Sequence, residues 1–278
     1  MIKWTMRIFL ILLAITAFSL FYLSFYGLET DYFNSTIQNK VKIINPSLNL
    51  EFQKTNILLD LKKLELKVKV KKPKINFNNT STDLNKLNLN ISIKSFLKNE
   101  FALQRGEVGL QKTDIKQFIE LANQVKPSTF LFLAKEFFNK GQIEGKLKVN
   151  FDTAGKIKDD YKIIGSVFNF DVKILKKFNI NKVNMKFELF KNNYNFYIVK
   201  GNINDIDLAN SEFEINKENK NLNVKANLVS RANLKNIQST LDLFQINLLE
   251  AKVDKSEISF DLKSSLSFQL EKYIKIKN

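Results

Sequence analysis

Residues 64–72 read LELKVKVKK, and this stretch decides the fold class. Apolar and charged residues alternate strictly along it. Because successive side chains of a β-strand point to opposite faces, one face would carry leucine and valine and the other glutamate and lysine. A strand with one apolar and one wetted face is typical of an antiparallel sheet. The stretch therefore predicts an antiparallel sheet with one water-avoiding side.

The same period of two recurs along most of the chain. It begins at residue 48 and returns in the ranges 87–94, 147–151, 213–215, 222–228, 258–262 and 266–270. Spacers rich in Asn, Lys and Asp separate these runs, as turns between successive hairpins would. We expect a mainly β fold of about a dozen strands. The alternation still reads as strand near the C-terminus, so we expect the chain to be a fragment or a short version of something longer.

The N-terminus predicts a transmembrane helix. Residues 8–25 carry no charge and, at about 1.5 Å per residue, would cover roughly 27 Å, close to the hydrocarbon thickness of a bilayer. Lys3 and Arg7 precede this segment, whereas the first acid, Glu29, follows it. The positive-inside rule therefore places the first residues in the cytoplasm and the rest of the chain on the far side of the membrane.

We divide the chain into a cytoplasmic tip with its anchor, residues 1–28, and one exported domain, residues 29–278. The alternative for the apolar segment is a cleaved signal peptide. The run is longer than a typical signal core, and bulky Leu23 and Phe25 occupy the end where a cleavage site needs small residues. These features favour a retained anchor.

Directly after the anchor, the sequence predicts a short helix. Thr30 and Asp31 would cap it, and it would end before Asn45–Pro46, because the residue before proline avoids the helical region. Its apolar residues recur every four positions. Such a stripe would pack on the core or, alternatively, lie on the membrane beside the anchor.

A helical insertion is expected at about residues 113–140. Asp114 would cap a first helix with an apolar stripe at Ile115, Phe118, Ile119 and Ala122. A second helix, apolar on nearly all sides, would follow over residues 128–138. Covering the sheet and plugging one end of a cavity are its expected roles, and simple burial in the core is the alternative.

The composition excludes most catalytic and metal sites. The chain has no Cys and no His, so it lacks thiolate metal ligands, a Cys nucleophile and the usual general base. Ser95 and Lys98 match S-x-x-K without its companion motifs, and we interpret Ser95 as a local cap. We expect no enzyme activity, no metal and no cofactor. Only three of the 44 basic residues are Arg, which argues against nucleic acid as a partner.

The apolar side of the predicted sheet must be covered by a second sheet, by helices or by something that is not protein. A sheet folded over itself would form a sandwich, whereas a sheet curled into a trough would form a groove for acyl chains. Each methylene buried there would contribute roughly 0.8 kcal/mol. The candidate groove residues are Leu64, Leu66, Val68, Val70, Leu87, Leu89, Ile91, Ile93, Leu147 and Val149.

One resemblance sharpens this hypothesis. The anchor, the sequence YGLETDYFN at residues 26–34 that enters the first helix, the alternating strands and the helical insertion together resemble the N-terminal part of the AsmA-like family of Gram-negative envelope proteins (the YhdP and TamB group). The resemblance implies an inner-membrane anchor, a periplasmic β-groove and no catalysis. It also implies phospholipid transport and support of outer-membrane biogenesis. Such family members are usually longer than this chain.

We therefore predict a single-pass inner-membrane protein whose curved antiparallel β-sheet groove, with a short helical insertion, shields phospholipid acyl chains in the periplasm. The alternative is a membrane-anchored β-sandwich that serves as scaffold or assembly factor for envelope proteins. The partners would be acyl chains and the inner membrane in the first case, and other proteins of the cell envelope in the second.

Overall fold

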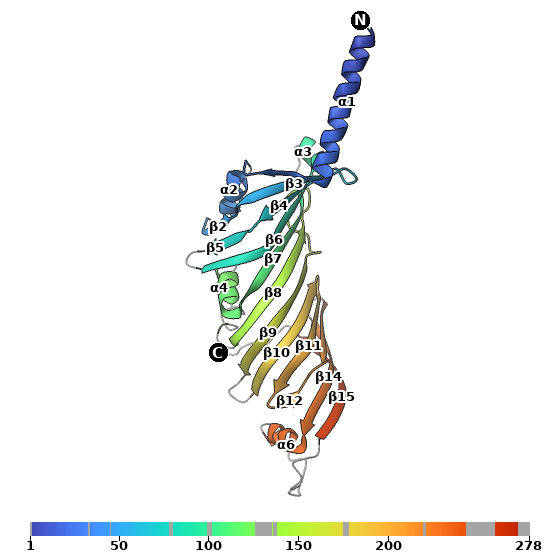
Figure 1. The fold of residues 1–278 in the computed structure, drawn as a ribbon. Coiled ribbons are helices and arrows are strands. Elements are labelled where there is room, and N and C mark those ends of the chain that lie inside the picture. The colour runs from blue at the N-terminus through green and yellow to red at the C-terminus, as the bar shows by residue number, and fades with distance from the viewer. Residues whose placement is uncertain are drawn as a thin grey trace. The chain divides into compact units, whose positions relative to one another are not determined.

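The computed structural model describes residues 2–32, 34–44, 46–77, 80–98, 102–125, 135, 138–174, 178–218, 221–242 and 259–271. The chain is mainly β, with one large antiparallel sheet, an N-terminal apolar helix and few other helices, as the alternation predicts (Figure 1). It divides into two compact units. Unit 1 comprises Met1–Leu110 and Leu147–Tyr161, and unit 2 comprises Gln111–Lys146 and Lys162–Asn278.

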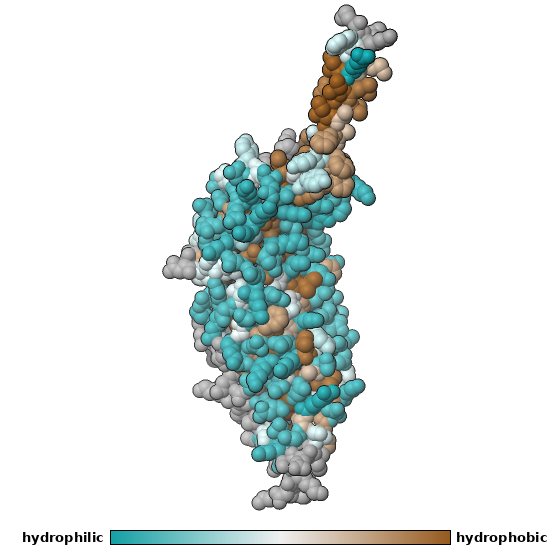
Figure 2. All heavy atoms as spheres, in the orientation of Figure 1, coloured by the Kyte–Doolittle hydropathy of each residue, from teal (hydrophilic) through white to brown (hydrophobic). Residues whose placement is uncertain are grey.

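The first helix, α1 (Ile2–Phe25), confirms the predicted apolar segment. Its span Trp4–Phe25 is long and apolar enough to cross a membrane, and none of it is buried against the rest of the chain. Brown side chains cover most of α1 in Figure 2, whereas the face of the sheet seen there is mostly teal. This helix is therefore suited to single-pass anchoring in a membrane.

The anchor joins the sheet at Gly27. This glycine has a φ of 75°, and a Cβ added to it would lie only 2.9 Å from the carbonyl oxygen of Ile57 and 3.0 Å from the side chain of Leu58. Glycine alone combines that backbone conformation with such close packing. The chain then enters β1 (Leu28–Thr30), which pairs with β3 (Lys54–Asp60).

Unit 1 holds the first strands of the sheet. Besides β1 and β3 these are β2 (Leu48–Glu51), β4 (Glu65–Lys71), β5 (Lys74–Phe77), β6 (Thr80–Ser92) and most of β7 (Leu103–Asp114). Hydrogen bonds order the ladder β1-β3-β4-β6-β7, while β5 pairs with β2 and with β6. Helix α3 (Ile93–Leu97) follows β6 directly.

Helix α2 (Asn34–Ile44) packs on the core of unit 1. Ile37 and Val41 on this helix contact a buried cluster of Leu50, Val70 and Leu87. The core-packing interpretation is confirmed, and the helix ends before Asn45–Pro46 as expected. The predicted cap was wrong, because Thr30 belongs to β1, where its carbonyl oxygen accepts a hydrogen bond from Thr55 Oγ1 at 2.8 Å.

Unit 2 holds the later strands and two helices. They are β9 (Lys162–Ile174), β10 (Phe178–Phe190), β11 (Asn193–Ile203), β12 (Ile206–Asp207), β13 (Glu212–Glu218), β14 (Asn221–Asn233), β15 (Ser259–Glu271), α4 (Ile115–Val125) and α6 (Leu234–Asp242). Strand β8 (Phe138–Asn150) contributes residues to both units. Neighbouring strands pair antiparallel throughout, and β14 pairs with β15 along its whole length.

Helix α4 confirms the first half of the predicted insertion. The backbone N–H groups of Lys116 and Gln117 donate to Asp114 Oδ1 at 2.9 and 3.2 Å, which is the expected cap. Most of the second predicted helix, at 128–138, lies outside the described residues, but Phe138 begins strand β8, so the predicted end of the insertion at residue 140 was wrong. Helix α6 was not predicted, although Asn233 Oδ1 caps it by accepting from the N–H of Asn236 at 2.8 Å.

Candidate functional site

The apolar face of unit 1 is arranged in rows that cross the strands. Leu59, Leu66, Ile91 and Leu103 are cross-strand partners in β3, β4, β6 and β7, so their side chains share one face. All four are half-buried. Within the described part of the chain, this Leu66 row is an apolar surface that no second layer closes completely.

A parallel row on the same face is filled from within the protein. Thr55, Val70, Leu87 and Val108 are partners across the same four strands. Val70 and Leu87 are only 7% and 8% exposed, because α2 and β2 pack over them. At this end of unit 1, the protein's own side chains occupy the space that a groove would offer.

The ten predicted groove residues therefore divide into three groups. Val68, Val70 and Leu87 are buried, Leu64 is 53% exposed, and the other six are half-buried: Leu66, Leu89, Ile91, Ile93, Leu147 and Val149. Gly106 lets Val149 approach β7, since a Cβ there would lie 3.2 Å from Val149 Cγ2. The structure brings most of the predicted face together but buries part of it.

Two of these residues are not in strands, which corrects the prediction. Leu64 lies in the turn between β3 and β4 with a φ of 51°, because two antiparallel strands need a reversal there. Ile93 begins helix α3, which Ser92 caps by accepting from the N–H of Ser95 at 3.1 Å. An alternating pattern cannot show where a turn or a cap interrupts it.

Unit 2 carries a longer apolar row than unit 1. Phe187 in β10 is the cross-strand partner of Gly165 and Phe196, and the register continues through the next strands. The resulting Phe187 row crosses six strands and consists of Gly165, Phe187, Phe196, Phe213, Ala226 and Leu266. Its three phenylalanines are half-buried and Leu266 is 50% exposed.

A second row lies two residues away on the same face. This Leu189 row joins half-buried side chains of five strands: Ile163, Leu189, Tyr194, Ile215 and Val224. On the other flank of the Phe187 row, Ile115 and Ile119 of α4 pack on Val167, and Phe187 itself packs against this cluster. One end of the apolar face is thus closed by a helix, and the rows beyond it are covered only in part.

The size of this face can be compared with a lipid tail. Six strands at about 4.8 Å spacing make the Phe187 row roughly 24 Å long. One leaflet contributes about half of a hydrocarbon core of about 30 Å, so a single acyl chain extends roughly 15 Å. The row is long enough to lie against a whole acyl chain.

The apolar rows in β9 to β11 were not predicted from the sequence. Their signal was nevertheless present, because Met185, Phe187 and Leu189 alternate with Lys186 and Glu188. What the sequence does not contain is the register that aligns Phe187 with Phe196 and Phe213. That alignment turns separate apolar positions into a continuous surface.

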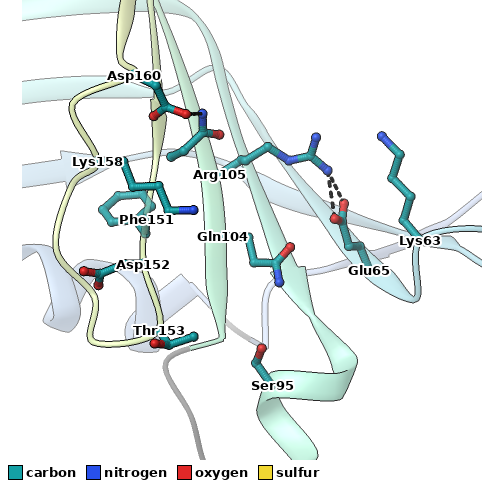
Figure 3. Close-up of a pocket in the computed structure, with 11 residues that line it drawn as sticks. Lys63, Glu65, Ser95, Gln104, Arg105, Phe151, Asp152, Thr153, Lys158 and Asp160 are labelled. Carbon is teal, nitrogen blue, oxygen red and sulfur yellow. Dashed lines mark hydrogen bonds and ion pairs between the residues drawn. The ribbon is translucent and has the colours of Figure 1, made fainter. Parts of the chain in front are cut away.

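Unit 1 also contains a polar hollow of about 700 Å³ (Figure 3). Three basic and three acidic side chains line it: Lys63, Arg105 and Lys158, and Glu65, Asp152 and Asp160. Glu65 is buried and accepts hydrogen bonds from Arg105 Nη2 at 2.5 and 2.8 Å, and from Asn90 Nδ2 at 2.9 Å. Because its lining is polar and its central carboxylate is already paired, this hollow does not suit an acyl chain.

The hollow does not bring together Ser95 and Lys98 of the S-x-x-K match either. Ser95 lines it, but Lys98 is exposed and is not among the lining residues. Asp160 Oδ2 accepts from Asn150, and Asp152 Oδ1 accepts from the backbone of Ala154. Among the residues that the structure describes, no cluster of three or more carboxylates could hold a metal ion. The hydrogen bond from Asn150 to Asp160 fixes the loop after β8 to that strand.

No family model, curated protein or solved structure matches this chain. The two half-covered apolar faces, one in each unit, are therefore the features from which a function can be argued.

Proposed function

We propose that this chain is a single-pass protein of the inner membrane whose exported β domain shields phospholipid acyl chains. In this proposal the domain lies in the periplasm and contributes to lipid transport for outer-membrane biogenesis. The observation that carries the proposal is the Phe187 row. It crosses six strands, and its phenylalanines are half-buried with no second sheet packed over them among the described residues.

The physical argument is the cost of leaving such a surface in water. Apolar area contributes about 25 cal/mol per Å² when it is removed from water, so the exposed part of a half-covered phenylalanine row favours an apolar guest. An acyl chain is long, flexible and unbranched, and it can follow a row of side chains. Each methylene that it buries adds about 0.8 kcal/mol. A face that is only half-covered can release the chain again, as transport requires.

The charge pattern supports the proposed orientation. Lys3 and Arg7 lie directly before the apolar segment, whereas the first basic residue after it is Lys40. Positive residues flanking the first helix favour a cytoplasmic N-terminus. The exported domain would then meet lipid tails on the periplasmic side.

Photo-crosslinking tests this proposal in intact cells. A photoreactive phenylalanine analogue replaces Phe196 in the Phe187 row or, in the control, its neighbour Tyr197. Tyr197 lies on the opposite face of β11, where its hydroxyl donates to Asn210 Oδ1 at 2.8 Å. With ³²P-labelled lipids, we expect lipid adducts at position 196 that exceed those at 197 severalfold. Equal adducts, or none at position 196, would contradict lipid shielding.

A second candidate function is an anchored scaffold for envelope proteins. It is favoured by the two core clusters, in which α2 and α4 fill part of each apolar face with the protein's own side chains. In that case the analogue at position 196 would yield protein adducts, or none, instead of lipid adducts. The same experiment therefore separates the two candidates.

A further inference from the structure

Three large apolar side chains are exposed at two connections of unit 1. Leu61 and Leu64 lie in the turn between β3 and β4 and are 48% and 53% exposed, and Leu97 at the end of α3 is 76% exposed. Exposed leucines at single positions are ordinary. Three exposed leucines on adjacent connections form an apolar patch, which is typical of a site that contacts an apolar partner.

The two connections are neighbours in space. The backbone N–H of Ile93, at the start of α3, donates to the carbonyl oxygen of Leu64 at 3.0 Å. Helix α3 also packs on β4 and β6. The turn at residues 61–64 and α3 thus form one patch, which we name the membrane-contact surface.

This surface lies beside the point where the anchor leaves the sheet. Gly27 follows α1 and packs against Leu58. Leu61 is three residues beyond Leu58, which is roughly 10 Å along a strand. Figure 1 shows α3 and the turn at the same end of unit 1 as the base of α1. A bilayer that holds α1 therefore has its surface within reach of the three leucines.

The turn is fixed by local contacts. Asp60 Oδ1 accepts from the N–H of Lys63 at 3.2 Å, and the ammonium of Lys67 lies 2.7 Å from Asp60 Oδ2. The hydrogen bond from Lys67, followed by that from Lys63, lowers the pKa of Asp60. The two acids that flank the turn are therefore both engaged, Asp60 by these lysines and Glu65 by Arg105, while Leu61 and Leu64 are exposed.

The charge around the leucines matches an anionic surface. Residues 61–64 read LKKL and residues 93–98 read IKSFLK, so four lysines flank the apolar positions and neither segment contains an acid. These are Lys62, Lys63, Lys94 and Lys98, all exposed. Lysine beside exposed leucine is typical of segments that lie in the interface of a bilayer. Each lysine near an anionic lipid surface strengthens binding by about fivefold.

We infer that the membrane-contact surface binds the bilayer that α1 spans, with Leu61, Leu64 and Leu97 in the interfacial region and the lysines against anionic lipid head groups. This inference shares the anchor with the proposed function but is independent of acyl chains on the sheet. Among the apolar segments near the anchor, it assigns membrane contact to α3 and the turn rather than to α2. Because α1 tethers the surface beside the lipid, even weak contacts hold it there.

The absence of Cys from these 278 residues allows a direct test on the whole chain. Leu64→Cys and Leu97→Cys are each labelled with an environment-sensitive fluorophore and reconstituted into phosphatidylcholine vesicles that contain phosphatidylglycerol. Asp83→Cys is the matched control. It is exposed near the other end of β6, nine residues from Ser92 and roughly 30 Å from α3.

We expect blue-shifted emission at positions 64 and 97 and at least twofold quenching by lipids that carry a nitroxide near the head group. Position 83 should show neither effect. Emission at 64 and 97 that matches position 83 would overturn the inference, as would a shift that needs an added protein. Replacing the four lysines with Gln should remove most of the quenching, and unchanged quenching would exclude the head-group contact. Crosslinking at Phe196 reports separately on the proposed function.

Discussion

Arg105 in β7 holds the buried carboxylate of Glu65 in β4 across the intervening strand β6. Its Nη2 lies 2.5 and 2.8 Å from the two carboxylate oxygens, and Asn90 of β6 donates to the same group. The side chain of Glu65 is only 7% exposed. The fold tolerates a buried carboxylate only while a cationic partner is present, because removal of the partner leaves the charge desolvated and unpaired.

Arg105→Ala should therefore lower the free energy of unfolding by about 2 kcal/mol. Circular dichroism of the detergent-solubilised chain in urea measures this change. The control is Arg231→Ala, which removes a pair with Asp261 whose side chains are 62% and 75% exposed, and it should cost less than about 0.5 kcal/mol. Equal losses in the two variants would show that the burial of Glu65 is not decisive.

Loss of the α4 cap is expected to lower the free energy of unfolding less than Arg105→Ala does. Asp114→Ala removes the acceptor of the N–H groups of Lys116 and Gln117 and should cost about 1 kcal/mol of unfolding free energy. Asp114→Asn keeps an oxygen acceptor and should retain most of the stability. Urea titration of both variants checks the order. If the two substitutions cost the same, the negative charge rather than the hydrogen bond stabilises the helix start.

The environment of Asp171 predicts that the stability of the fold depends on pH. Burial acts to raise its pKa, but the N–H of Lys182 at 2.7 Å and the ammonium of Lys140 at 2.9 Å together hold that pKa below its ordinary value. A lowered folded-state pKa means that the charged group stabilises the fold above the unfolded pKa of about 3.9, and that this stability is lost as pH falls through the folded value.

Asp171→Asn should thus cost about 1 kcal/mol near pH 7, and this difference from the parent chain should shrink below about pH 4. Unfolding free energies at several pH values measure it. Asp83→Asn, at an exposed position, should leave stability nearly unchanged at every pH. A difference for Asp171→Asn that stays constant as the pH falls well below 4 would mean that the carboxylate charge does not stabilise the fold.

Local patterns predicted the elements whose stabilising contacts are local. Asp114 caps α4 through hydrogen bonds to residues two and three positions ahead, and the alternation around Val68 follows from the geometry of one strand. Leu64 shows where a local pattern fails to predict the structure. It continues the alternation perfectly, yet the chain must reverse there, and no neighbouring Gly or Pro marks the turn.

Long-range register could not be predicted. Arg105 and Glu65 are 40 residues apart, and they meet only because β4 pairs with β6 instead of β5. The Phe187 row depends on the same kind of information. Each phenylalanine occupies an apolar position of its own strand, but a shift of one residue in any pairing would move it to the other face.

The apolar rows of unit 2 give a sharp prediction for lipid capture. Ile215 in β13 belongs to the Leu189 row, and the adjacent Glu214 is exposed on the opposite face. Ile215→Asn places an amide against the proposed acyl chain and removes roughly two methylene equivalents of contact, at about 0.8 kcal/mol each. Lipid adducts at the photoreactive position 196 should then fall about tenfold.

Glu214→Asn introduces the same side chain on the wetted face and should leave the adducts unchanged. Circular dichroism confirms that both variants fold, and equal adduct yields in the two folded variants would mean that this row does not hold the lipid.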